Sequence, residues 1–272
     1  MPHAEARGRK IYYELHGEEV AAGDPTLMLI MGMAGSCRGW LPLQVPEFSK
    51  SRRVLIFDHR GVGGSEDDAK PFTTADLAED AVALLDSLGL ARVDVLGAFM
   101  GGMVAQELVL AHPARVDRLV LVGTYTRPDA KRRMLLEDWA ALAQAGISVE
   151  AMVRKRLVWT LQDETLEQTD LIESMVEFFN RESAPVSPDL FARQCRACID
   201  HDAADRVREI PHPTLVVCGR HDQLTPPKFH RELADEIPRA RLVTIGYGAH
   251  LVMAESAERF NRVVLDFLAQ RS

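Results

Sequence analysis

Residues 93–113 read VDVLGAFMGGMVAQELVLAHP, and this stretch decides the fold. An apolar run predicts a buried strand, which leads through Gly97, Ala98, Phe99, Met100 and Gly101 directly into a helix. A strand, a tight turn and a helix form the context of a nucleophile elbow, usually written G-x-S-x-G. Two glycines fit this interpretation, because side chains two positions from the centre would collide with the neighbouring strand and helix. Phe99 stands at the centre instead of serine.

The phenyl ring of Phe99 has no lone pair to attack a carbonyl group and no proton for a histidine to take. An acyl-enzyme route through this position is therefore excluded. Ser36 and Cys37 follow another predicted loop and could border the same pocket, but both lie outside the turn that presents a nucleophile. The alternative interpretation of the segment is an ordinary strand-to-helix junction with Phe99 in the core.

Short apolar strands alternate with amphipathic helices along most of the chain, which predicts a mostly parallel sheet. Strands are expected at 10–15, 26–31, 53–57, 92–96, 118–122, 214–218 and 241–245. Helices are expected near 73–88, 100–111, 227–236 and 255–270. Because several strands are apolar at nearly every position, helices should cover both faces of the sheet.

The alternation stops between residues 125 and 208, where helical patterns replace it. An insertion at this place would lie over the carboxyl ends of the strands, where ligands bind in such folds. We therefore predict a core of residues 1–124 and 209–272 and a helical cap at 125–208, inserted before the last two strands. Aromatic residues of the cap are candidates for shaping a ligand pocket: Trp139, Trp159, Phe178 and Phe179.

Two later loops carry an acid and a histidine. The strand at 214–218 leads into GRHDQLTPP, which contains Asp222, and the strand at 241–245 leads into GYGAH, which ends at His250. The chain order of elbow, acid and base predicts that Asp222 orients His250 as a catalytic dyad. The alternatives are a turn-capping aspartate and a solvated loop histidine.

The strand at 26–31 opens into a glycine-containing loop, Met31 to Gly35. A loop at this place can supply one main-chain N–H to an oxyanion hole, and the residue after the elbow centre supplies the other. We therefore expect Met33 and Met100 to be the oxyanion or substrate-binding groups. Their side chains matter little for this role, because the donors are main-chain groups.

These segments resemble the α/β-hydrolase superfamily over almost the entire chain. FDHRGVGGS at 57–65 is similar to its D-x-R-G-x-G-x-S segment, while QLTPP and GAH are similar to its acid and histidine loops. The most similar branch contains cofactor-free haloperoxidases, proline iminopeptidase relatives, enol-lactonases and methylesterases of aromatic polyketides. The resemblance implies the α/β-hydrolase fold, and branch members with a complete triad hydrolyse esters, lactones or amides. Their serine has no counterpart in this chain, so their nucleophile is not carried over.

Composition limits the partners and the location. A net charge of −8 argues against nucleic acid and membrane surfaces as partners, which leaves a small molecule. The first ten residues lack the apolar core of a signal peptide and no apolar run could span a bilayer, so a cytoplasmic location is expected. The C-x-x-C pair at Cys195 and Cys198 lies in a helical stretch, without a second pair to complete a zinc site. We expect no cofactor and no metal, and the sequence leaves the oligomeric state open.

Three functions remain open at this point. In the first, His250 held by Asp222 acts as a general base on a small apolar or aromatic molecule. Such an enzyme would be a lyase, cyclase, decarboxylase, cofactor-free oxygenase or water-mediated hydrolase. In the second, the chain is an inactive homologue that binds a ligand or regulates. In the third, Phe99 has replaced the serine of an ester or lactone hydrolase in this particular chain. Retention of the dyad favours the first, because a pure binding pocket has no evident need for it.

Overall fold

The computed structural model describes residues 2–17, 25–181 and 186–270, and its centre is an eight-stranded sheet. The strand order is β1-β2-β4-β3-β5-β6-β7-β8. The strands are β1 (His3–Ala6), β2 (Arg9–His16), β3 (Thr26–Ile30), β4 (Val54–Phe57), β5 (Val93–Ala98), β6 (Val116–Val122), β7 (Thr214–Gly219) and β8 (Ala240–Ile245). The β1–β2 and β2–β4 pairings are antiparallel and the other pairings are parallel, as expected for a mostly parallel sheet.

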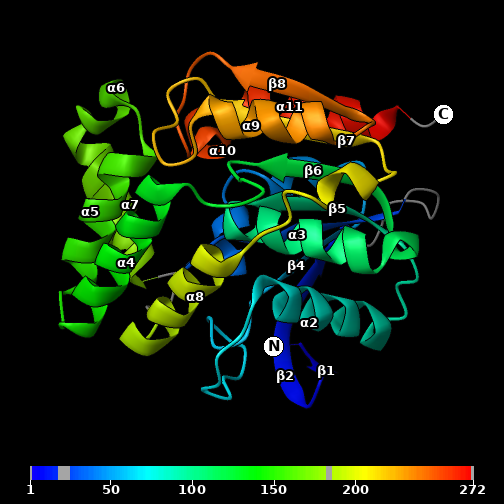
Figure 1. The fold of residues 1–272 in the computed structure, drawn as a ribbon, viewed down its shortest axis with the longest axis horizontal. Helices are drawn as coiled ribbons and strands as arrows, with labels where there is room; N and C mark the ends of the chain where they lie inside the picture. The colour runs from blue at the N-terminus through cyan, green and yellow to red at the C-terminus, as the bar shows by residue number, and fades with distance from the viewer. Residues whose placement is uncertain (1, 18–24, 182–185, 271–272) are drawn as a thin grey trace.

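Helices cover both faces of the sheet (Figure 1). One face carries α2 (Thr74–Ser87), α3 (Met100–Ala111) and α9 (Pro227–Glu236), and the other carries α1 (Val45–Phe48) and α11 (Ala257–Ala269). In β3, Leu27 and Leu29 join the apolar cluster under α1 and α11, whereas Met28 and Ile30 join the cluster under α2 and α3. Alternate residues of a strand point to opposite faces, so a strand covered on both faces must be apolar throughout.

The expected helix at 255–270 is divided. The structure has α10 (Val252–Glu255) and α11 with Ser256 between them, where the backbone leaves the helical region at φ −130° and ψ 46°. Short 3₁₀ helices also occur in the described part of the chain: η1 (Cys37–Trp40), η2 (Pro113–Arg115) and η3 (Val207–Glu209).

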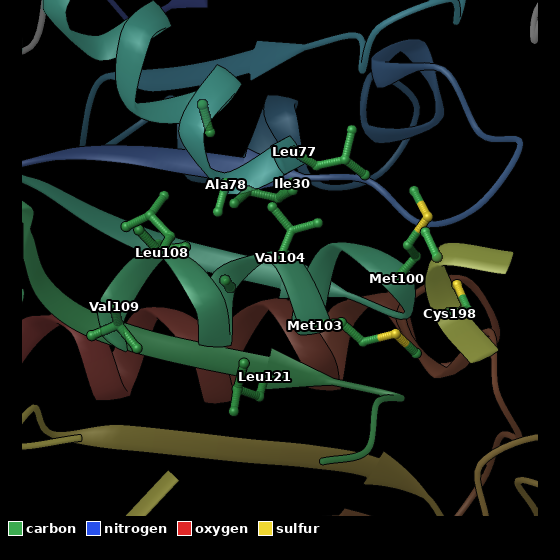
Figure 2. Close-up of a cluster of buried hydrophobic side chains, with 14 of the residues drawn as sticks. Ile30, Leu77, Ala78, Met100, Met103, Val104, Leu108, Val109, Leu121 and Cys198 are labelled. Carbon is green, nitrogen blue, oxygen red and sulfur yellow. The ribbon is translucent and has the colours of Figure 1, made fainter. Parts of the chain in front are cut away.

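Helix α3 is buried along most of its length. Figure 2 shows Val104 directed toward Ile30 of β3, while Met100 and Met103 at the start of the helix lie beside Cys198. A helix start packed in this way has little freedom to move, so the turn between β5 and α3 is fixed at the carboxyl end of the sheet.

Among the residues that the structure describes between β6 and β7, five α-helices precede η3, and we call them the cap segment: α4 (Ala130–Gln144), α5 (Val149–Thr160), α6 (Asp163–Leu166), α7 (Thr169–Arg181) and α8 (Pro188–Asp200). Figure 1 shows α4 to α7 gathered beyond the carboxyl ends of β6 and β8. All four cysteines are buried and unpaired, and Cys195 and Cys198 lie in α8.

Across the residues that the structure describes, no helix combines the length and apolar character needed to cross a bilayer. The same part of the chain contains no group of three or more His, Cys, Asp or Glu side chains arranged to hold a metal ion.

Candidate active site

Phe99 lies at a strained turn between β5 and α3. Its backbone has φ 61° and ψ −120°, a region that residues other than glycine rarely adopt. A Cβ added at Gly97 would lie 2.3 Å from the carbonyl oxygen of Gly101, and one added at Gly101 would lie 2.1 Å from that of Ile30. The backbone therefore has the strained turn that the sequence predicts, and both glycines are required by close approach.

The phenyl ring of Phe99 fills the space above this turn. It stacks on the imidazole ring of His250, with ring centroids 4.2 Å apart and an interplanar angle of 27°. A Cβ added at Gly32 would lie 2.6 Å from the Phe99 ring, and one added at Gly123 would lie 2.8 Å from it. The ring is thus accommodated between two glycines that have no side chain to oppose it.

Asp222 and His250 come together from two loops and are both 4% exposed. Nδ1 of His250 lies 2.9 Å from Oδ2 of Asp222. The hydroxyl of Thr225 donates to Oδ2 of Asp222 at 2.7 Å, and the Thr225 N–H donates to Oδ1 at 2.7 Å. Burial raises the pKa of Asp222, but attraction to His250 and the hydrogen bonds outweigh it, so this pKa lies below its usual value. An ionised Asp222 therefore fixes a proton on Nδ1 of His250.

The second ring nitrogen of His250, Nε2, makes no hydrogen bond to any residue that the structure describes. His250 also lines a cavity. Because Nδ1 carries the proton that faces Asp222, Nε2 of the neutral ring has the lone pair. An unprotonated imidazole nitrogen of this kind is able to act as a general base.

The sequence pattern gave no sign of a further histidine near the dyad, because His230 reads as one position of an amphipathic helix. It lies in α9 and is fully buried. Burial lowers the pKa of His230 to about 4. Near neutral pH this ring is therefore uncharged and adds no cation beside Asp222.

The loop that carries His250 is tied to the cap segment by hydrogen bonds. The N–H of Leu251 donates to the carbonyl of Thr160 at 2.9 Å, and the N–H of Gly248 donates to Oε1 of Gln162 at 3.0 Å. Glu255 joins the two sides, because it accepts from the N–H of Ala249 and from the N–H of Gln162. The corner between α5 and α6 thus supports the position of His250.

Phe99 and His250 face a cavity of about 450 Å³, within the usual range for small-molecule sites. Its walls are mainly apolar, and Trp139, Phe178 and Phe179 of the cap segment contribute to them. Trp159, which we expected among them, does not line the cavity and lies beside Lys131, whose Nζ is 5.1 Å from the ring centroid. The expectation was wrong because another face of α5 meets the cavity, with Val153, Arg156, Leu157 and Thr160 at helical spacing.

Met33 and Met100 line the same cavity. Met100 begins α3, so its N–H has no partner within the helix. The loop at Met33 is held from the cap segment, because Nη2 of Arg156 donates to the Met33 carbonyl at 3.1 Å. The N–H of Ala34 donates to Oε1 of Gln194 at 2.8 Å.

By their place in the sequence Ser36 and Cys37 could border the pocket, but they are not among the described residues that line it. The chain turns them under the loop, where the Cys37 N–H donates to Oδ1 of Asp58 at 2.7 Å. Burial, followed by the nearby charge of Asp58, raises the pKa of the Cys37 thiol. A buried, protonated thiol is a poor nucleophile.

A family model described as the alpha/beta hydrolase fold matches residues 25–257. The chain belongs to the α/β-hydrolase family, as its motifs predict.

Named proteins that are similar to this chain include the following three. The RutD protein of Caulobacter sp. (strain K31), named as a candidate carbamate hydrolase, is 32% identical over 260 residues, or 95% of this chain and 96% of that protein. The crystal structure of the enol-lactonase from Burkholderia xenovorans LB400 has a TM-score of 0.89 and 28% identity, covering 99% of this chain and 100% of that chain. BpoC of Mycobacterium tuberculosis H37Rv, named as a candidate non-heme bromoperoxidase, has a TM-score of 0.84 and 30% identity, covering 95% of both chains.

Proposed function

We propose that this protein is an enzyme that acts on a small apolar or aromatic molecule through His250 and Asp222, without a serine nucleophile. The observation that supports the proposal is a buried, hydrogen-bonded Asp222–His250 pair beside the phenyl ring of Phe99. Burying a carboxylate is costly unless its hydrogen bonds are satisfied. A complete orienting network around one histidine is therefore expected where the histidine is used.

In the proposed reaction, Nε2 of His250 removes a proton from the bound molecule or from water, and Asp222 stabilises the imidazolium that forms. The N–H groups of Met33 and Met100 stabilise negative charge that develops on a substrate oxygen. Elimination, ring closure, decarboxylation, cofactor-free oxygenation and direct attack by water all fit this scheme. Residues 125–208 would act as a cap over a core formed by 1–124 and 209–272.

A ligand-binding protein without catalytic activity is the second candidate. The filled space at the nucleophile position favours it, because the Phe99 ring stacks directly on His250. The third possibility, an exchanged serine, is opposed by the fit of the ring between Gly32 and Gly123.

Proton exchange in D₂O tests the proposal without knowledge of the natural substrate. Aromatic ketones and 1,3-dicarbonyl compounds are incubated with the protein, and loss of their acidic C–H signal is followed by ¹H NMR. We expect exchange that falls on the order of a hundredfold or more in His250→Gln. His112→Gln, which changes a partly exposed histidine paired with Glu79, serves as the matched control. Binding of these compounds without His250-dependent exchange would contradict the proposal and support the ligand-binding candidate.

A further inference from the structure

We infer that Arg156 forms an anion subsite in the cavity, and that the molecule bound there carries a carboxylate on an apolar, ring-containing body. This subsite would hold the substrate of the proposed enzyme, so the inference rests on the proposed function where it concerns reaction of the bound molecule at His250. Binding of the carboxylate itself does not depend on any reaction at His250.

Arg156 projects from α5, is half-buried and lines the cavity. Nη2 donates to the Met33 carbonyl at 3.1 Å, and the guanidinium carbon lies 5.7 Å from the centroid of the Phe191 ring. Nε is buried and has no hydrogen-bond partner. In the part of the chain that the structure describes, no carboxylate forms an ion pair with this guanidinium.

Arg132 is the natural comparison, because it lines the same cavity. Its Nη1 lies 2.9 Å from a carboxylate oxygen of Asp129, and its other nitrogens donate to the carbonyls of Gln223 and Leu224. The charge of Arg132 is therefore satisfied within the protein. With the residues that the structure describes, Arg156 makes one hydrogen bond, whereas a guanidinium has five N–H donors.

The other charged side chains of the cavity wall are engaged, and so are most of its uncharged polar side chains, Trp139 being an exception. The charge of Glu255 is met by hydrogen bonds from two main-chain N–H groups and one hydroxyl. His250 is paired with Asp222. Uncharged lining residues each make a hydrogen bond within the protein: Gln44, Tyr125, Thr160, Thr165 and Ser174. Among the charged residues that the structure describes along the cavity wall, Arg156 alone has neither a partner of opposite charge nor more than one hydrogen bond.

An unmet guanidinium beside an apolar cavity is unfavourable, because the charge loses hydration without gaining a counter-ion. Burial accordingly lowers the pKa of Arg156. A planar carboxylate matches the guanidinium fork and restores the missing interaction. The hydrogen bond to Met33 alone would not require arginine, since a shorter uncharged donor could make one such contact. The arrangement fits an aromatic or alicyclic carboxylic acid in its ionised form.

The test uses the whole protein and a panel of ring-containing acids, each compared with its own primary amide. The panel contains 2-naphthoate, 4-phenylbenzoate and cyclohexylacetate, and binding is measured by isothermal titration calorimetry near pH 7. The acid and amide of each pair have almost the same shape, so their affinity ratio isolates the negative charge. We expect at least one acid to bind roughly tenfold to a hundredfold more tightly than its amide, as charge-assisted hydrogen bonds imply.

Variants then locate the effect. Arg156→Gln should abolish the preference for the acid while leaving affinity for the amide within about threefold. Arg156→Lys should retain part of it, because a cation without the planar fork remains. Arg154→Gln is the matched control, since Arg154 lies on the outer face of α5 and pairs with Glu150 and Glu173.

The outcomes separate the two proposals. If no acid binds better than its amide, including the case in which none binds below about 1 mM, the anion subsite is refuted. A preference that survives in Arg156→Gln also refutes it. A preference that persists in His250→Gln, together with an absence of His250-dependent exchange in D₂O, would uphold the subsite and reject the enzyme.

Discussion

The turn at Phe99 and the Asp222–His250 pair differ in which parts of a catalytic site they contain. On one side, the turn at Phe99 keeps a strained backbone and its two close-packed glycines, but the central side chain has no reactive atom. On the other side, Asp222 and His250 keep both side chains, their mutual contact and the support of Thr225. The first side has the backbone shape of a nucleophile elbow without a nucleophile, and the second has a carboxylate in contact with a histidine.

This contrast has a physical origin. The turn is closely packed, because backbone atoms of Gly101 leave no room for a Cβ at Gly97 and those of Ile30 leave none at Gly101. These contacts do not involve the side chain at the centre of the turn. The dyad is held by hydrogen bonds between polar groups that packing alone would not select. Close packing accounts for the turn without any catalytic role, whereas the hydrogen-bonded Asp222–His250 pair supports the proposed role of His250.

The largest effect is expected from Gly101→Ala. The added Cβ would lie 2.1 Å from the Ile30 carbonyl oxygen and 2.7 Å from that of Met31, and these are backbone atoms that cannot rotate away. We expect a loss of about 3 kcal/mol or more in the free energy of unfolding, measured by urea titration.

Gly246→Ala is its control on the histidine side, because no atom lies within 4 Å of the added Cβ. That variant should change the free energy of unfolding by less than about 0.5 kcal/mol. Equal stability of the two variants would show that packing does not enforce the elbow.

A smaller effect is expected from Asp222→Asn, which removes a buried charge from the hydrogen-bonded network. We expect a loss of about 2 kcal/mol at neutral pH, the scale of hydrogen bonds to charged groups. The pKa of Asp222 is lowered by folding, so its contribution is full above the usual value of 3.8 and is lost as pH falls through the folded pKa.

The difference between wild type and Asp222→Asn should therefore shrink as urea titrations are repeated below pH 3.8. Exposed Asp235, changed to asparagine, provides the comparison and should show little effect at any pH. A difference that stays constant across this range would mean that the carboxylate is not ionised in the folded protein.

The smallest effect on stability is expected from Phe99→Ser, about 1–2 kcal/mol, because the ring is only half-buried. This variant restores the hydroxyl beside His250 and should gain weak hydrolysis of activated esters and labelling by a fluorophosphonate. The wild type should not be labelled.

Phe99→Ala opens the same space without a hydroxyl and controls for access to the cavity. A folded Phe99→Ser protein that is neither labelled nor active would show that more than the nucleophile has been lost. Stoichiometric labelling of the wild type at Ser36 would instead reveal a different nucleophile.

Much of the sheet was predictable, because apolar runs in buried strands and the glycines of the elbow are local signals. The sequence missed β1, which spans His3–Ala6 and has only Ala6 fully buried, so no apolar run marks it. Asp222 and His250 were found through the order of their loops along the chain.

The rest of the site depends on which face of a helix meets the cavity. Trp159 and Arg156 are neighbours on α5, yet the arginine lines the cavity and the tryptophan does not. Thr225 and His230 were missed because a threonine after a turn and a histidine in a helix carry no distinctive local pattern. Thr225 contacts Asp222 within a single loop, whereas His230 comes near Asp222 only when α9 packs against that loop.

The hydrogen bonds between the cap segment and the loop of His250 have a mechanical consequence. Thr160 and Gln162 hold Leu251 and Gly248, so lifting this corner away from the sheet would pull the imidazole away from Asp222. The corner between α5 and α6 is therefore suited to stay in place as a hinge, and unsuited to be a contact that is released when the cap segment moves. If the cap segment opens to admit a ligand and the contact between His250 and Asp222 stays intact, the movement has to pivot about this corner.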